Sequence, residues 1–207
     1  MKTIKATTEL IAPPSYKELL RTIELAGRVC YKSEHRITND SAEEFVEMIL
    51  KRGHEAVIEH GSLTVKFICD RGVSHELVRH RLASYCQEST RYCNYSKKQF
   101  EGDITFIEPC FLEQGTHAYD LWRDALSKCE WTYFELLDLG LMPQEARSVL
   151  PNALKTEVVM TANLREWRHF LKLRTADAAH PQMRELTRPL LETLKNMYPV
   201  FFKDITY

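Results

Sequence analysis

The most informative stretch of this chain is an arginine-rich polar segment, Arg79-His80-Arg81-Leu82-Ala83-Ser84-Tyr85-Cys86-Gln87-Glu88-Ser89-Thr90-Arg91-Tyr92. A buried segment could not carry so many donors without leaving some unpaired, at about 1–3 kcal/mol each. Arginine forks beside hydroxyl and amide groups suit a planar, anionic ligand such as a nucleotide phosphate. A solvated basic face is the alternative, and Glu76 is then the obvious partner for Arg79 and His80.

The residues before this segment predict a helix. Ser74 can act as its N-cap, and the helix would run from His75 to about Ser84. Successive helical residues are turned by about 100°, so Arg79 and Arg81 would point roughly 160° apart. Either the helix lies between two binding surfaces, with ligands near a subunit interface, or it frays where the chain becomes extended after Ser84.

Size and composition bound the class of protein. The chain has 207 residues, 44% of them hydrophobic, and a formal net charge of −1. It is long enough for one domain with a full core, and its charge argues against a nonspecific nucleic-acid binder. No apolar run approaches the roughly 20 residues that span a bilayer, and Met1-Lys2-Thr3-Ile4 does not begin a signal peptide. We therefore expect a cytoplasmic protein with reduced thiols and without membrane contact.

The periodicity predicts one α+β domain over residues 1–207, with a mixed sheet packed by long helices. Strands are expected at residues 2–11, 63–69, 104–107 and 156–161, and helices at residues 16–30, 41–52, 116–139, 163–174 and 181–198, with a further helix opening at Pro143. Asn163 is the expected N-cap of its helix, with Glu166 in the capping-box position.

One of these helices has an arginine on its apolar side. Leu164, Trp167 and Leu171 form the apolar stripe of the helix over residues 163–174, and Arg174 continues that stripe by one more turn. A cation there is either a partner for the helix dipole or a hook for a ligand. Arg165 and His169 share a different stripe, which is either a second ligand surface or an exposed polar face.

Several motifs together resemble the flavin-dependent thymidylate synthases. Arg79-His80-Arg81, followed by seven residues and Ser89, is similar to the family signature. Three flanking segments are also similar at family-like distances, namely Gly53-His54-Glu55 through Glu59-His60, Ala146-Arg147-Ser148-Val149-Leu150-Pro151, and Asn163-Leu164-Arg165-Glu166-Trp167 with Phe170-Leu171-Lys172-Leu173-Arg174. The resemblance covers about residues 26–190.

The resemblance implies an activity, ligands and an assembly. The reaction would be reductive methylation of dUMP to dTMP, with methylenetetrahydrofolate as carbon donor and FAD and NADPH supplying the reduction. A homotetramer with sites shared between subunits is implied, and no nucleic acid or metal is expected as a ligand.

The resemblance also implies roles for individual residues. Arg174 would be catalytic, stabilising negative charge at the N3 edge of the pyrimidine. The expected FAD contacts are Ala56, Arg79, His80, Arg81, Gln87, Asn163, Leu164, Arg165 and His169. The expected dUMP contacts are Glu76, Leu77, Val78, Arg79, Gln87, Glu88, Ser89, Thr90, Arg91, Arg147 and Arg174.

Some positions depart from the family pattern. Many members have Asn-Glu where this chain has Cys86-Gln87, and the carboxylate of Glu88 stands one residue later. On a strand such a shift would turn the side chain to the opposite face. His169 stands where Asn is also found, and Ala56 where a hydroxyl residue is common. Two other classes stay open at this point, a single-stranded nucleic-acid-binding module and an inactive flavoprotein scaffold.

Overall fold

The computed structural model describes residues 1–97 and 102–207 of the chain. These residues form two compact units, each built from segments that lie far apart in the sequence. Unit 1 comprises Met1–Thr7, Phe67–Arg79 and Cys86–Val159, and unit 2 comprises Thr8–Lys66, His80–Tyr85 and Met160–Tyr207. The single-domain organisation expected from the sequence stays a prediction.

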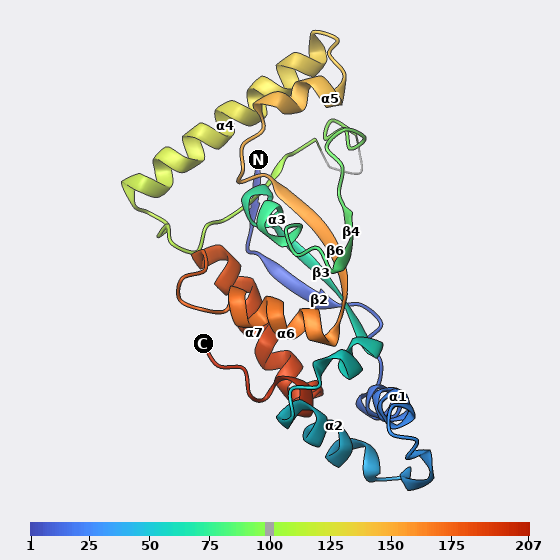
Figure 1. The fold of residues 1–207 in the computed structure, drawn as a ribbon. Helices are drawn as coiled ribbons and strands as arrows, with labels where there is room; N and C mark the ends of the chain where they lie inside the picture. The colour runs from blue at the N-terminus through green and yellow to red at the C-terminus, as the bar shows by residue number, and fades with distance from the viewer. Residues whose placement is uncertain (98–101) are drawn as a thin grey trace. The chain divides into compact units, whose positions relative to one another are not determined.

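The described residues mix helices and strands, as the sequence predicts (Figure 1). A four-stranded sheet has the order β2-β3-β6-β4, built from β2 (Thr7–Leu10), β3 (Ser62–Asp70), β6 (Lys155–Asn163) and β4 (Ala83–Gln87). The helices are α1 (Tyr16–Val29), α2 (Ser41–Lys51), α3 (Arg71–Leu77), α4 (His117–Asp138), α5 (Pro143–Ala146), α6 (Leu164–Arg174), α7 (Pro181–Met197) and α8 (Pro199–Phe202), with 3-10 turns η1 (Glu34–Arg36), η2 (Glu55–His60) and η4 (Arg147–Val149).

Unit 1 has a small sheet and its own apolar core. Strand β1 (Lys2–Ile4) pairs in parallel with β5 (Thr105–Ile107). Phe106 of β5 packs into a cluster with Leu126 and Tyr133 of α4, so that the long helix is fixed by its buried face. In Figure 1, α5 lies against the end of α4.

Unit 2 is built around α6. Trp167 and Phe170 of this helix are fully buried and meet edge to face, with ring centroids 5.5 Å apart. The indole of Trp167 donates to the carbonyl of Leu63 in β3 at 3.0 Å, which ties the helix to the sheet. Helix α7 lies beside α6 (Figure 1), and its residue Leu191 is also fully buried.

Most element predictions are confirmed. The helices expected at residues 16–30, 41–52, 116–139, 163–174 and 181–198 appear within a residue or two of those bounds, and so do the strands at residues 63–69, 104–107 and 156–161. The strand expected over residues 2–11 is wrong as a single element, because β1 and β2 belong to different sheets.

The helix predicted from His75 to Ser84 is also wrong in both bounds. Asp70, not Ser74, is the N-cap of α3, and its carboxylate accepts from the Val73 amide at 2.7 Å. Ser74 lies inside the helix and donates to the carbonyl of Arg71. Since α3 ends at Leu77, Arg79 and Arg81 are not on a helix, and the argument from their opposed directions does not apply.

Among the described residues, no helix combines the length and the apolar character needed to cross a membrane. None of the six cysteines of the chain, all of which the structure describes, is joined in a disulfide. Burial raises the pKa of the Cys69 thiol to about 12, so this cysteine behaves as a core residue.

Candidate functional site

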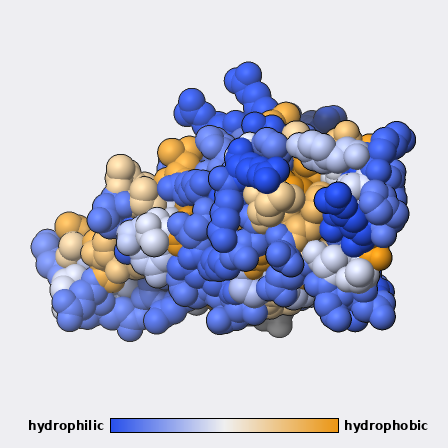
Figure 2. Space-filling model, turned by 60° about the horizontal axis from the view of Figure 1, so that its bottom comes forward, coloured by the Kyte–Doolittle hydropathy of each residue, from blue (hydrophilic) through white to orange (hydrophobic). Residues whose placement is uncertain are grey.

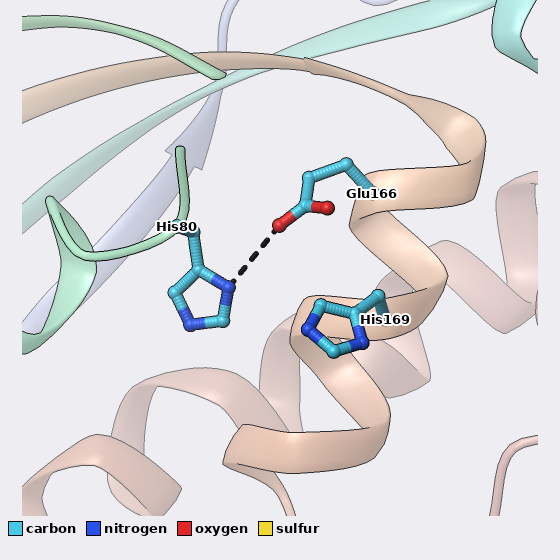
Figure 3. A group of neighbouring side chains, drawn as sticks. All are labelled: His80, Glu166 and His169. Carbon is cyan, nitrogen blue, oxygen red and sulfur yellow. Dashed lines mark hydrogen bonds and ion pairs between the residues drawn. The ribbon is translucent and has the colours of Figure 1, made fainter. Parts of the chain in front are cut away.

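Three ionisable side chains of unit 2 form a continuous hydrogen-bonded chain. Nδ1 of His80 lies 3.2 Å from Oε1 of Glu166, and Nε of Arg174 donates to Nε2 of His80 at 3.0 Å. Figure 3 shows the imidazole of His80, which comes from the loop before β4, directed toward the carboxylate that α6 supplies. The imidazole thus lies between a carboxylate and a guanidinium.

The surroundings of His80 keep its ring neutral. His80 is 6% exposed, and the ring of Phe170 meets it edge to face at 4.9 Å. Burial lowers the pKa of His80 below its usual range, and the positive charge of Arg174 lowers it further, although Glu166 acts in the opposite direction. The phenol of Tyr85 donates to the carbonyl oxygen of His80 at 2.7 Å and fixes its backbone.

The start of α6 places Glu166 differently from the prediction. Asn163 is the N-cap, as expected, and its side chain accepts from the Glu166 amide at 2.8 Å. The reciprocal bond of a capping box is not formed, because the Glu166 carboxylate contacts His80 instead. A carboxylate expected to cap the helix is therefore part of the site.

A cavity of about 500 Å³ opens beside this chain of contacts. It is lined by Glu55, Glu59, Leu82, Asn163, Arg165, Glu166, Arg168, His169 and Lys172. Arg165 and His169, one turn apart on α6, both line it. That this stripe of α6 binds a second ligand stays a prediction. Arg165 donates to Glu59 at 2.7 Å, and both side chains are largely exposed.

Unit 1 gathers most of the residues that were expected to bind dUMP. Gln87 donates through Nε2 to Ser74 at 3.0 Å and to Thr156 at 3.3 Å. Glu88 instead accepts from Lys155 at 3.0 Å and from the phenol of Tyr95 at 3.3 Å. The two neighbours thus have separate sets of partners, so the carboxylate of Glu88 does not occupy the place of Gln87.

Two exposed arginines of unit 1 are anchored by neutral side chains. Arg91 donates through Nε to Gln144 at 3.0 Å, and Arg147 donates through Nη1 to the buried Thr90 at 3.1 Å. Neither bond is to a carboxylate, so neither guanidinium is neutralised by it. Such arginines are suited to an anionic ligand.

The remaining expected site residues differ in exposure. Ala56, Val78, Arg79 and Arg81 are exposed, and Glu76 and Ser89 are partly buried. Leu77 and Leu164 are fully buried, so that only their backbone groups could contact a ligand. Their side chains contribute to the core.

One group of side chains could also be considered for a metal ion. Ligand atoms of His80, Glu166 and His169 lie within 4.8 Å of one another (Figure 3). The guanidinium of Arg174 is hydrogen-bonded to His80, and a fixed positive charge there opposes a second cation. That the chain uses no metal stays a prediction.

Sequence reasoning gave no site role to Glu166, Tyr85 or Glu55. Glu166 contacts a residue 86 positions away, and no local pattern reports such a contact. Glu55 lines the cavity and forms ion pairs with Arg165 and Arg168. One sequence feature could have indicated the role of Glu166. It is a carboxylate in the first turn of a helix that also carries residues expected to contact ligands.

Comparison with known proteins identifies the family. The model of the family described as thymidylate synthase complementing protein matches residues 14–200. A relative from Pyrococcus furiosus is 34% identical over 185 residues, which cover 86% of this chain and 75% of the relative. Relatives from Geobacter sulfurreducens and Mycobacteroides abscessus are 34% and 33% identical, over 88% and 96% of this chain and 80% and 87% of their own lengths.

The chain belongs to this thymidylate synthase family. All three relatives are named flavin-dependent thymidylate synthase. The enzyme class of the chain is therefore the flavin-dependent one, with dTMP as its product and dUMP as its substrate. The resemblance drawn from the signature and its flanking segments is confirmed.

Proposed function

We propose that this enzyme converts dUMP to dTMP by reductive methylation, with methylenetetrahydrofolate as the carbon donor and FAD, reduced by NADPH, as the cofactor. The observation that carries the proposal is the position of Arg174, a half-buried arginine at the C-terminal end of α6. Its Nε donates a hydrogen bond to Nε2 of His80 at 3.0 Å. A planar guanidinium fixed at Nε has a defined plane, and a defined plane is what recognition of a pyrimidine edge requires.

The chemistry of the cavity in unit 2 fits part of a flavin dinucleotide. Arg165, His169 and Lys172 supply positive or hydrogen-bonding groups for a pyrophosphate, and Asn163 offers an amide. We propose that these α6 residues, with Arg79, His80 and Arg81 of the signature, hold the cofactor. When bound, the flavin would supply the redox step, and the protein supplies binding, orientation and electrostatics.

The arginine-rich segment and Arg147 would hold the nucleotide. Arg91 and Arg147 are proposed to neutralise the phosphate of dUMP, while Gln87 and Ser89 offer hydrogen bonds to the nucleoside. Arg174 would stabilise the negative charge that develops at the N3 edge of the pyrimidine, which makes the ring carbon a better nucleophile. Such electrostatic stabilisation by a prearranged donor is worth about 10²–10³ in rate.

The test is dTMP formation by the purified, flavin-loaded protein, measured with and without added FAD, together with the variant Arg174→Ala. We expect Arg174→Ala to abolish dTMP formation while the flavin spectrum of the purified protein persists, because the arginine acts on the pyrimidine. Arg184→Ala is the matched control, since this arginine of α7 contacts the exposed Asp177. Near-normal turnover in Arg174→Ala would show that Arg174 only neutralises the helix dipole.

A further inference from the structure

We propose that Glu166 is a positioning residue for Arg174 and acts through one fixed tautomer of His80. The inference rests on the proposed role of Arg174 at the pyrimidine. It starts from two contacts of one imidazole, Nδ1 to Glu166 at 3.2 Å and Nε2 to Arg174 at 3.0 Å. Together they join a carboxylate to a guanidinium through a ring that is 6% exposed.

The hydrogen atoms of this chain can be assigned from the chemistry of its partners. Arginine has no acceptor and does not lose its proton in proteins, so Nε of Arg174 must donate and Nε2 of His80 must accept. The single proton of the neutral imidazole then lies on Nδ1, where the Glu166 carboxylate accepts it. A doubly protonated His80 would turn two donors toward each other at Nε2 and lose the contact with Arg174.

The surrounding packing makes this arrangement rigid. Phe170 lies edge-on to the imidazole at 4.9 Å, and Tyr85 holds the backbone of His80 through its carbonyl at 2.7 Å. The backbone of Arg174 is held as well, because Thr187 of α7 donates to its carbonyl at 2.9 Å. With the backbones of His80 and Arg174 both held, the contact at Nε of Arg174 depends on which ring nitrogen of His80 offers a lone pair.

Glu166 decides that choice. Without an acceptor at Nδ1, the N–H of the buried imidazole would be unpaired, which raises the free energy of this arrangement. The ring can avoid this penalty by turning over or by moving its proton to Nε2. Either change withdraws the acceptor from Arg174. A glutamine at position 166 keeps one acceptor oxygen of the same reach, removes the charge and replaces the other oxygen with an amide donor. A leucine removes the acceptor and keeps a similar volume.

The tautomer itself can be measured in the flavin-loaded enzyme by nitrogen NMR with ¹⁵N-labelled histidine, with His80→Gln used to assign the signal. We expect wild type and Glu166→Gln to show a neutral His80 protonated at Nδ1. We expect Glu166→Leu to lose this signature. Glu24→Gln is the matched control, since Glu24 is another carboxylate of unit 2 that is 1% exposed and accepts from Arg28 and Ser41 away from the site.

Steady-state kinetics measure the consequence for catalysis. A misplaced group costs about 10²-fold in rate when it shifts by about 1 Å, so Glu166→Leu should lower kcat about a hundredfold, with KM for dUMP changed only a few-fold. Glu166→Gln should stay within about tenfold of wild type, and Glu24→Gln should match wild type for the folded, flavin-loaded fraction.

Three outcomes would overturn the inference. They are a wild-type His80 protonated at Nε2, equal losses in Glu166→Gln and Glu166→Leu, and a Glu166→Leu enzyme with unchanged kcat. If Glu166→Leu does not fold, the wild-type tautomer and its retention in Glu166→Gln decide the matter. An active enzyme with the other tautomer refutes the positioning role alone, whereas a flavin-loaded protein that makes no dTMP refutes the proposed function.

Discussion

At the scale of single residues, the two cysteines of the arginine-rich region lie in different surroundings. Cys86 is exposed on β4. Cys93 is partly buried, and burial together with the nearby charge of Glu88 raises the pKa of its thiol. A nucleophilic cysteine needs a lowered pKa or a positioned base, and the raised pKa of Cys93 is the opposite of that requirement.

We therefore expect Cys86→Ala and Cys93→Ala each to keep dTMP turnover within about tenfold of wild type, a change of under about 1.4 kcal/mol in the barrier. The reason is that, in the proposed mechanism, arginine polarisation of the pyrimidine and the flavin would replace a protein nucleophile. Steady-state rates of the folded, flavin-loaded variants provide the measurement, with Arg174→Ala as the control for a severe loss. A loss of several orders of magnitude in Cys86→Ala would contradict a mechanism without a sulfur nucleophile.

The departure at Cys86-Gln87, with the carboxylate of Glu88 one position later than in many family members, is another feature of this scale. The sequence indicated that a carboxylate one position later would have different neighbours, and the structure pairs Glu88 with Lys155, which in turn donates to Glu157 at 2.6 Å. The amide of Gln87 donates to two hydroxyl groups, those of Ser74 and Thr156. Position 87 is thus neutral, and the negative charge of position 88 is balanced within unit 1.

At the scale of elements, the cap of α3 gives a direct test of the corrected helix. Asp70→Ala should lower the free energy of unfolding by about 1 kcal/mol, because the Val73 amide loses its acceptor. Asp70→Asn should stay close to wild type, since asparagine is an equally good N-cap. Urea denaturation followed by circular dichroism measures both variants, and equal destabilisation by Ala and Asn would show that the charge of Asp70, not its capping bond, is what matters.

Sequence periodicity predicted the elements whose own pattern determines them. Helices α1, α2, α4 and α7 carry apolar residues at helical spacing, and β3 alternates buried and partly buried residues. The region after α3 was predicted incorrectly, because its conformation depends on distant partners. His80 leaves the helix to meet Glu166 and Arg174, and these contacts span 86 and 94 positions of the sequence.

The candidate site, like the fold, could be predicted only in part from the sequence. The family signature led to Arg174, Arg165 and His169, which the structure brings to α6 of unit 2. The part played by Glu166 could not be predicted, since an N-terminal glutamate of a helix is usually explained by capping. Only its contact with His80 distinguishes the two roles.

At the scale of the whole molecule, several large apolar side chains are exposed. Leu25 and Tyr31 in and after α1 are 57% and 61% exposed, and Trp131 of α4 is 53% exposed. Figure 2 shows hydrophobic residues in several groups among the hydrophilic ones on one face. Buried in a subunit interface, such side chains would contribute about 25 cal/mol per Å² of apolar surface.

We expect the active enzyme to be a homotetramer with ligand sites shared between subunits. Sedimentation velocity at the concentration used in the activity assay measures the assembly, and the same sample should be assayed for dTMP formation after stepwise dilution. Activity should fall as the tetramer dissociates, because each site would lose residues from its partners. A monomer that retains full activity would contradict this assembly.

The pairing of strands that lie far apart in the sequence has a consequence for folding during synthesis on the ribosome. Strand β3 is the neighbour of β6 in the sheet, and Thr64 of β3 is hydrogen-bonded to Thr161 at 2.9 Å across 97 positions of sequence. The nascent chain therefore presents β3 without this partner until residues 155–163 have emerged. Pairing over such separations is slow, and an unpaired strand is open to aggregation in the meantime. Yield in the cell should consequently depend on how long chaperones protect this first half of the chain.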